Sequence, residues 1–366
     1  MQPYFSFQWH ITDECDQRCK HCYIYAANAS KQPMAMGWSL MEDTFYNCLD
    51  FCKVYGRNPY FYITGGDPIL HQDFWRLLAL LQKHNAPFTI LGNPFHLSDL
   101  ICLELKACGC EKYQMSIDGL RKTHDWFRKP GSFDETLAKV GCINRAGIRS
   151  VIMTTVSKAN IMEVPGIIDA VVAAGVNVYA FARYVPSGGS LDTGMSALEY
   201  RRLLEVCDRK FREYEATACA TWFNRKDHLW TLFAYETGAF KIPNYACPGV
   251  IYGGCNCGNA HLTILPDGDV YACRRVAGSK VGNTAVDRLA DLWITELERY
   301  REYESFAKCS RCRLLPFCRG CPAVAKGSGG DFYGDDPQCW ADEKSGLFTP
   351  QKREDKAKSE RKVMVC

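Results

Sequence analysis

The sequence predicts an α/β protein: a parallel sheet with covering helices, followed by a smaller cysteine-rich domain. Strand-like and helix-like segments alternate six times over about 185 residues, which is typical of parallel α/β folds. Polar and glycine-rich motifs follow the first, second and fourth strands, at the edge where such folds form active sites. A second field of closely spaced cysteines lies after residue 246.

The individual elements are predicted from residue periodicity and from the signals at their ends. The strands are expected at residues 4–9, 60–63, 88–91, 112–117, 150–156 and 178–184, and the helices between them at 39–55, 73–84, 99–107, 132–147 and 164–174. Serine–glutamate capping boxes are predicted to open three helices, at Ser39, Ser132 and Ser196. Six strand–helix units are two short of a complete eight-unit barrel.

The composition is that of an ordinary globular protein and excludes several function classes. Of 366 residues, 47% are hydrophobic and 23% are charged, and the net charge is +3. So small a charge, without a Lys/Arg stripe, argues against a nucleic-acid partner. No apolar run reaches about 18 residues and the N-terminus lacks a signal-peptide pattern, so we expect a cytoplasmic protein without a membrane partner.

The 21 cysteines indicate metal binding rather than disulfides. A reducing compartment disfavours disulfides, and an odd number of cysteines cannot pair completely within one chain. Cys15, Cys19 and Cys22 form a C-x3-C-x2-C pattern directly after the first strand. Three thiolates are one short of the four in a closed iron–sulfur or zinc site, and the open position that results suggests catalysis.

This loop, with His21 before the third cysteine and Tyr23 after it, resembles the cluster loop of the radical S-adenosylmethionine (SAM) enzymes. Two further motifs match that family in order and position: GGDP at residues 65–68, after the second strand, and SIDG at residues 116–119, after the fourth. The resemblance implies a partial (β/α)6 TIM-like barrel. It also implies a [4Fe–4S] cluster on the three cysteines and SAM bound at the open position.

The same resemblance implies a set of SAM-binding residues. The glycines of GGDP allow a close backbone approach, and in the family this motif holds the SAM amino group. Asp67 stands where Glu is usual and is one methylene shorter. Arg128 is a candidate for the SAM carboxylate, because a guanidinium pairs well with a carboxylate. The predicted cofactor-binding residues are Tyr23, Gly65, Gly66, Asp67, Ser116, Asp118 and Arg128. No catalytic residue is assigned beyond the cluster.

The second cysteine field is arranged around a predicted β-hairpin. Residues 261–265 and 270–273 read as its strands, joined by a tight turn, and residues 291–306 read as a helix. The spacing of the surrounding cysteines resembles the SPASM extension of radical SAM enzymes. Those cysteines are Cys257, Cys273, Cys309, Cys312, Cys318, Cys321 and Cys339. One spacing departs from the pattern, since two residues rather than three separate Cys318 from Cys321.

The SPASM resemblance implies two auxiliary [4Fe–4S] clusters. Carried over by position, the first uses Cys257, Cys273, Cys321 and an upstream cysteine, either Cys247 or Cys255; the second uses Cys309, Cys312, Cys318 and Cys339. The shortened spacing raises the prospect of an open position in the first cluster. Zinc is the alternative metal, because paired C-x2-C motifs also form zinc sites. The other cysteines, such as Cys48 in a helical pattern, are expected to act as small buried hydrophobes.

Four regions follow from these motifs. We expect a radical SAM core at residues 1–190, a helical bridge at 191–245, a SPASM domain at 246–345 and a disordered charged tail at 346–366.

The resemblance implies reductive cleavage of SAM to a 5′-deoxyadenosyl radical, which abstracts a substrate hydrogen. We expect a ribosomally synthesised peptide or a protein as the substrate, modified by a thioether cross-link or another side-chain change. The alternatives are a sulfatase-maturating, formylglycine-generating enzyme and, from another class, a non-catalytic iron–sulfur or zinc electron-transfer or binding protein. Expected partners are a flavodoxin- or ferredoxin-type electron donor and, because the loop begins at residue 15, a separate peptide-recognition protein.

Overall fold

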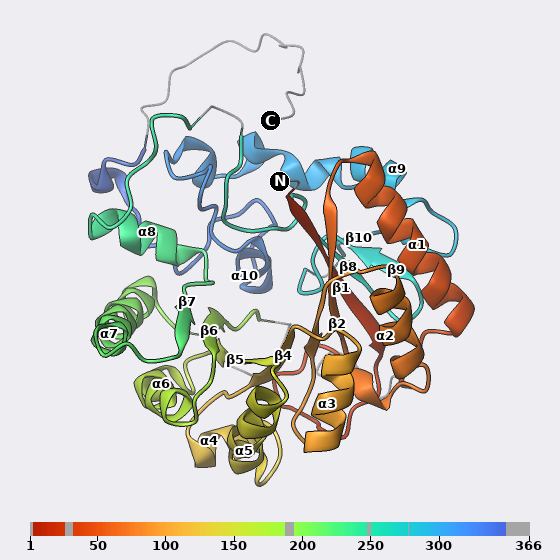
Figure 1. The fold of residues 1–366 in the computed structure, drawn as a ribbon. Helices are drawn as coiled ribbons and strands as arrows, with labels where there is room; N and C mark the ends of the chain where they lie inside the picture. The colour runs from red at the N-terminus through yellow and green to blue at the C-terminus, as the bar shows by residue number, and fades with distance from the viewer. Residues whose placement is uncertain (1–2, 26–31, 187–193, 247–249, 277, 349–366) are drawn as a thin grey trace.

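The computed structural model describes residues 3–25, 32–186, 194–246, 250–276 and 278–348. Its framework is one ten-stranded sheet in the order β10-β9-β8-β1-β2-β3-β4-β5-β6-β7 (Figure 1). The strands are β1 (Tyr4–Thr12), β2 (Asn58–Gly65), β3 (Phe88–Leu91), β4 (Lys112–Ser116), β5 (Arg149–Val156), β6 (Val178–Arg183), β7 (Trp222–Asn224), β8 (His261–Ile264), β9 (Asp269–Tyr271) and β10 (Lys280–Asn283). The six predicted strands are all present, and the mixed α/β class is confirmed.

The parallel part of the sheet is longer than the sequence predicted. β1 to β7 pair in parallel in chain order, and β8 also pairs in parallel with β1. β7 lies in the stretch expected to be a helical bridge, and its three residues are too few to show a strand pattern. The predicted hairpin is confirmed as the antiparallel pair β8 and β9. Because β8 joins β1, the cysteine-rich region shares its sheet with the first domain.

Helices cover the outside of this curved sheet (Figure 1). They are α1 (Trp38–Val54), α2 (Phe74–Lys83), α3 (Asp99–Ala107), α4 (Arg121–Phe127), α5 (Ser132–Arg145), α6 (Val164–Ala173), α7 (Ala197–Ala216), α8 (Leu229–Glu236), α9 (Leu289–Ile294) and α10 (Pro322–Gly327). α4, α8 and α10 were not predicted as individual helices. α9 lies on α1, where the Tyr55 hydroxyl donates a hydrogen bond to the Ala290 carbonyl over 2.7 Å.

Two of the three capping-box predictions are wrong. Gly37 and Gly131 stand at the N-caps of α1 and α5, and neither helix start carries a side-chain cap bond. Ser196 does form the full capping box with Glu199 at the start of α7. The prediction of a single helix over residues 291–306 is also wrong. The helix in this region, α9, ends at Ile294, and short 3-10 turns follow it at Glu298–Arg301 and Tyr303–Ser305.

The side chains of β1 alternate between two environments, as strand geometry requires. Phe5 and Phe7 are buried on the outer face, with ring centroids 4.5 Å and 5.8 Å from that of Phe51 on α1. Ser6 and Gln8 are only partly buried on the opposite, inner face. The hydrophobic core therefore lies between sheet and helices, and polar side chains of β1 face the interior of the barrel.

No helix among the described residues is long and apolar enough to cross a lipid bilayer. Most of the predicted charged tail, residues 349–366, lies outside the described residues.

Candidate functional site

The cysteine loop begins where β1 ends and lies against the ends of β2, β3 and α4. The Asp67 N–H donates to the Glu14 carbonyl over 2.6 Å, and the Lys20 N–H donates to the Phe127 carbonyl over 2.9 Å. Asn93, which follows β3, donates through Nδ2 to the Asp16 carboxylate over 2.7 Å. The loop is thus held at the carboxyl edge of the sheet, where the motifs predicted it.

The three thiols of this loop, on Cys15, Cys19 and Cys22, are partly buried. Burial raises the pKa of the Cys15 thiol to about 12. Burial also raises the pKa of Cys19, although the nearby Arg128 guanidinium, with Nη1 3.8 Å from the sulfur, opposes the shift. Because a thiol must lose its proton to bind a metal, metal binding here is coupled to proton release.

The two glycines of GGDP are required by the cysteine loop itself. Gly65 has φ +143°, and a Cβ there would lie 2.0 Å from the Thr12 carbonyl oxygen. A Cβ on Gly66 would lie 2.0 Å from the Glu14 carbonyl oxygen. The sequence argument expected these glycines to allow close approach to a ligand. The close approach that the structure shows is instead between the end of β2 and the backbone of the loop.

Asp67 is the one residue of GGDP with a side chain free to bind a ligand. Its carboxylate is fully buried and has no cationic or side-chain partner among the described residues, although the backbone N–H groups of Asn93 and Ile69 lie close enough to lower its pKa slightly. Desolvation, followed by the charge of Asp16, raises its pKa to about 7. A buried carboxylate without a cationic partner is costly, so this position fits a cationic ligand.

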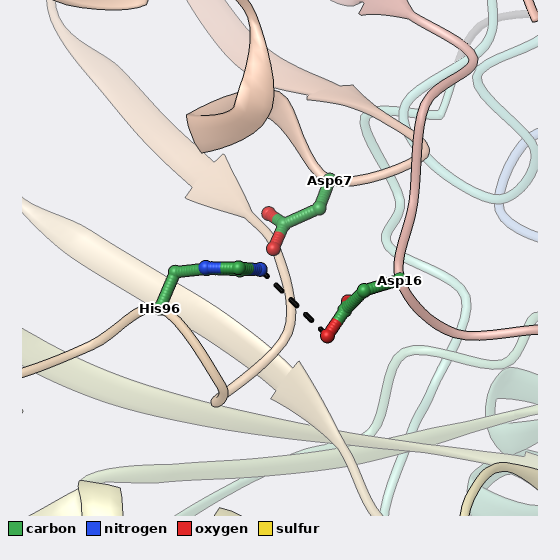
Figure 2. A group of neighbouring side chains, drawn as sticks. All are labelled: Asp16, Asp67 and His96. Atoms are coloured by element: carbon green, nitrogen blue, oxygen red, sulfur yellow. Dashed lines mark ion pairs between the residues drawn. The ribbon is translucent and has the colours of Figure 1, made fainter.

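Figure 2 shows that Asp67 shares its surroundings with Asp16 and His96, which come from two other loops. One ligand atom from each of the three residues lies within 4.8 Å of the other two, and His96 Nε2 is 3.7 Å from Asp16 Oδ2. An ammonium group placed here would meet two carboxylates. The residues present therefore fit the amino group of SAM.

Gly92 keeps this position open. A Cβ on Gly92 would lie 2.9 Å from Asp67 Oδ1 and 2.3 Å from the Tyr113 hydroxyl. Gly92, Asn93, Asp16 and His96 were missed by the sequence analysis, because they form no local motif and meet only through the fold.

Asp118 and Arg128, predicted as separate SAM contacts, bind each other. Arg128 donates to Asp118 Oδ2 through Nε at 2.7 Å and approaches it with Nη2 at 2.6 Å. His21 Nε2 lies 3.2 Å from the same oxygen. Burial alone would raise the pKa of Asp118, but Arg128 and His21 outweigh it and hold that pKa well below the usual range. Ser116 lies at the end of β4 and is partly buried.

Tyr23 lies between the cysteine loop and the cysteine-rich region. Its ring centroid is 5.9 Å from that of His10, and the Arg274 guanidinium lies 5.1 Å from it. Burial raises the pKa of its hydroxyl, and the thiols of Cys22 and Cys273 are both close enough to act on it. The two regions of predicted metal ligands therefore approach each other at Tyr23.

Four cysteines of the SPASM region come together in a first group. Cys257 is close enough to Cys255, Cys273 and Cys321 for each of their charges to raise its pKa, after burial as the main cause. Burial opposes ionisation of Cys255, but a hydrogen bond from His228 and the charge of Arg319 lower its pKa to about 6. Cys247, the other predicted upstream ligand, lies outside the described residues.

A second group contains the other four predicted SPASM ligands, Cys309, Cys312, Cys318 and Cys339. Burial, then the charges of Cys339 and Cys312, raise the pKa of Cys309 to about 12. Burial, followed by the charges of Cys309 and Cys339, likewise raises the pKa of Cys318. The grouping is the one that the family pattern implies.

The shortened spacing does not prevent Cys318 and Cys321 from facing different groups. Gly320 between them has φ +61°, and a Cβ there would lie 2.7 Å from Asp336 Cβ. Asp336 also accepts a hydrogen bond from the Cys321 N–H over 2.8 Å. Arg319, beside Gly320, is buried and donates to the Cys255 carbonyl over 2.7 Å.

A buried ion pair ties this loop to the barrel. Arg183, at the end of β6, contacts Asp336 through Nη1 at 2.6 Å and Asp227 through Nε at 3.0 Å. All three side chains are at most 5% exposed. No local pattern could predict this contact, because Asp227 and Asp336 lie 44 and 153 residues after Arg183 in the chain.

Two family models match the chain: the radical SAM superfamily over residues 9–171 and the SPASM iron-sulfur cluster-binding domain over residues 255–322. The AdoMet-dependent heme synthase of Nitratidesulfovibrio vulgaris is 27% identical over 90% of this chain and 90% of its own length. The mycofactocin maturase MftC of Mycolicibacterium smegmatis is 26% identical over 90% of this chain and 81% of its own.

Solved structures show the same fold. SuiB of Streptococcus suis bound to S-adenosylmethionine superposes with a TM-score of 0.71 at 19% identity, over 93% of this chain and 78% of that one. The anSMEcpe protein with bound AdoMet gives a TM-score of 0.68 at 17% identity, over 90% and 93%.

The two domain matches imply [4Fe–4S] clusters and SAM as cofactors, and they favour iron–sulfur over the zinc alternative. They agree with the grouping of cysteines into one set of three and two sets of four. The chain is a radical SAM superfamily enzyme that carries a C-terminal SPASM domain.

Proposed function

We propose that this enzyme generates a 5′-deoxyadenosyl radical at the cysteine loop and uses it to modify a peptide. The observation that carries the proposal is the proximity of the three loop thiols to Asp67, a buried carboxylate that has no cationic partner in the described structure. When bound, a [4Fe–4S] cluster with an open position supplies the electron that cleaves SAM.

The residues of the chain hold the cofactors and position them. Cys15, Cys19 and Cys22 hold the cluster, and Asp67 with Asp16 binds the SAM ammonium group. The ion pair of Arg128 with Asp118 positions the guanidinium beside Cys19. A buried cation so close to the sulfur stabilises its thiolate form. Arg128 is thus a positioning residue rather than a contact to SAM.

The SPASM cysteines form the two auxiliary sites. Cys255, Cys257, Cys273 and Cys321 are the proposed ligands of the first, and Cys309, Cys312, Cys318 and Cys339 those of the second. Cys255 is the better candidate for the upstream ligand, because its low pKa provides a thiolate beside the other three sulfurs. With four thiolates available, the first auxiliary site needs no open position.

Peptide modification is supported by several similar proteins. SuiB has been solved with its precursor peptide SuiA, anSMEcpe has been solved with peptides, and MftC is named a maturase. We propose a flavodoxin- or ferredoxin-type electron donor and a separate peptide-recognition protein as partners.

A tetrapyrrole substrate is the second candidate. Three heme synthases and an Fe-coproporphyrin III synthase are 24–27% identical to this chain, with the heme synthase of N. vulgaris at the top of that range. Both candidates require abstraction of a hydrogen atom from the substrate, so they share the radical step and differ in what is bound beside it.

Anaerobic reconstitution tests the radical step. The protein is loaded with iron and sulfide, mixed with SAM and dithionite, and assayed for 5′-deoxyadenosine. We expect about twelve irons per chain, from three clusters, and 5′-deoxyadenosine only when dithionite is present. A fully loaded protein that forms none would refute the proposal.

Deuterium transfer separates the two substrates. Deuterated peptides encoded beside the gene and deuterated coproporphyrin are each incubated with the reconstituted enzyme. Deuterium in 5′-deoxyadenosine from the peptide alone supports the first candidate. Deuterium from coproporphyrin alone shows that the second is correct.

A further inference from the structure

Five basic side chains from distant parts of the chain lie close enough to act on one another electrostatically. His10 lies on β1, His261 on β8, Lys226 follows β7, and Arg274 and Arg275 follow β9. Ser6 of β1 pairs with His261 of β8, and side chains alternate along β1, so His10 and His261 project from the same inner face of the sheet. We call these five residues the basic cluster.

The charges that act on these groups come from one another. Desolvation is the largest cause of the pKa shift of each of the three groups that follow. Arg274 and His261 then lower the pKa of His10, Lys226 lowers that of His261 to about 4, and Arg275 lowers that of Lys226 to about 8. The Lys226 side chain is exposed to solvent.

Two buried hydrogen-bond donors in the cluster find no acceptor among the residues that the structure describes. Gln8 Nε2 lies 3.2 Å from His10 Nε2 and, as an amide nitrogen, donates to it. A neutral His10 ring therefore carries its proton on Nδ1, which is buried and has no partner. Arg274 Nε is also buried without a partner. Both residues flank the Tyr23 ring, so a single acceptor there could serve both.

No carboxylate among the described residues pairs with the cations of the basic cluster. Lys226, Arg274 and Arg275 form no ion pair with any described carboxylate. Cations gathered without an anion repel one another, and a fold tolerates that arrangement where a ligand brings the missing charge.

We propose that the basic cluster binds a carboxylate group of the substrate and holds it beside Tyr23. This inference rests on the proposed function, because both candidate substrates, a peptide and a tetrapyrrole, carry carboxylates. A guanidinium fork binds a carboxylate with two parallel hydrogen bonds. Tyr23 adjoins Cys22, so the bound group lies next to the site where the radical forms.

The carboxylate of SAM does not account for the cluster. The amino and carboxylate groups of an amino acid share one carbon atom, so the SAM carboxylate must lie near Asp67. Asp67 acts on Cys15, whereas the basic cluster adjoins Cys22 and Cys273.

A role in balancing the charge of the first auxiliary iron–sulfur site explains only part of the basic cluster. Arg275 acts on the Cys273 thiol. No cysteine acts on Lys226, His261 or His10. The charges of these three residues therefore do not balance those of the thiols.

The test is equilibrium binding to the anaerobically reconstituted full chain with SAM present. The probes are coproporphyrin III, its tetramethyl ester, pentaglutamate and pentaglutamine. We expect one carboxylate probe to bind, and its neutral counterpart to bind at least about tenfold more weakly. Binding of coproporphyrin III alone identifies a tetrapyrrole carboxylate, and binding of pentaglutamate alone identifies a peptide carboxylate.

Variants then place the binding site. Lys226→Gln should weaken binding of the carboxylate probe by about tenfold, and Lys226→Arg should bind it as tightly as the native protein. Lys122→Gln, on the exposed face of α4, should leave the affinity unchanged. Iron content and SAM affinity should be the same in all three variants. The glutamine substitution lies on an accessible side chain, so the variant is expected to fold.

Several outcomes would overturn the proposal. They are the absence of binding by both carboxylate probes, equal binding of the neutral probes, stronger competition by inorganic phosphate than by acetate, or an effect of Lys226→Gln on SAM affinity or iron content alone. If the probes discriminate as expected but no 5′-deoxyadenosine forms, the binding site stands and the proposed function fails.

Discussion

The cysteine loop and the SPASM region bring thiols together in different ways. The loop offers three, beside a buried carboxylate, Asp67, that has no cationic partner among the described residues. The SPASM region offers two sets of four, and its buried carboxylate, Asp336, is bound by Arg183 and by the Cys321 N–H. The cysteine loop therefore has groups that still need a ligand. The groups of the SPASM region are already paired, so its sites need no further ligand.

The surrounding charges differ in the same way. Near the loop, Asp67 has a pKa raised to about 7 by burial. In the first SPASM group, a hydrogen bond from His228 and the charge of Arg319 overcome burial and lower the pKa of Cys255 to about 6. One region is thus arranged for a cationic ligand and the other for a thiolate.

Removal of one thiol from each region should give the largest effect and the sharpest contrast. We expect Cys19→Ala to abolish 5′-deoxyadenosine formation and lower the iron content from about twelve to about eight. Cys312→Ala should lose a similar amount of iron but still cleave SAM. Iron analysis and chromatographic assay check both variants. SAM cleavage by Cys19→Ala would show that the open cluster has been assigned to the wrong cysteines.

Asp67→Asn should weaken SAM binding by roughly tenfold or more, because it removes a charge-assisted hydrogen bond to the ammonium group. Equilibrium dialysis measures the affinity, and Asp43→Asn on the exposed face of α1 is the control. An unchanged affinity would remove Asp67 from the SAM site.

The same carboxylate predicts a pH dependence. Its pKa of about 7 lies above the usual value, so the native state binds a proton more tightly than the unfolded state does. Without SAM, its contribution to stability should therefore fall as pH rises from about 4 to about 7. SAM affinity should rise over the upper part of that range, because only the ionised form binds an ammonium group. Affinity that is flat between pH 6 and 8 would contradict this.

Arg183→Met tests the link between the two regions. It leaves Asp227 and Asp336 buried without their cation, which typically costs about 3–5 kcal/mol. Circular dichroism should show a thermal midpoint lower by roughly 5–10 °C. The exposed Arg288→Met, which loses an ion pair with Asp50, should shift it far less. Equal shifts would mean that the buried pair is not the tie we infer.

Cys48→Ala should have the smallest effect. Cys48 is fully buried in α1, and burial raises its pKa well above the usual value, so it acts as an apolar side chain. We expect an unchanged iron content of about twelve and a loss of about 1 kcal/mol in stability. Loss of four irons would show that the helical cysteines had been misread.

Sequence alone located the chemistry better than its surroundings. The cysteine spacing, GGDP and SIDG each follow a strand, so local pattern was enough to place them at one edge of a sheet. Asp16, Asn93 and His96 come from separate loops, and only the fold brings them to Asp67. Arg128 shows the same limit, because its ion pair with Asp118 was not predicted from the sequence.

The fold was predicted where elements were long and periodic. β7 has three residues and no pattern, so the seventh parallel strand could not be found. Two helices have a glycine at the N-cap, although a serine nearby completes the capping-box sequence that was expected there. In both cases the local residues alone did not decide where the element lay.

Electron paramagnetic resonance tests the central difference between the two regions most directly. SAM is added to the dithionite-reduced protein and to its Cys15→Ala, Cys19→Ala, Cys22→Ala triple variant, which keeps only the SPASM cysteines. The account predicts that SAM changes the spectrum of the native protein and leaves that of the triple variant unchanged. A spectrum of the triple variant that responds to SAM would show that the open site lies in the SPASM region.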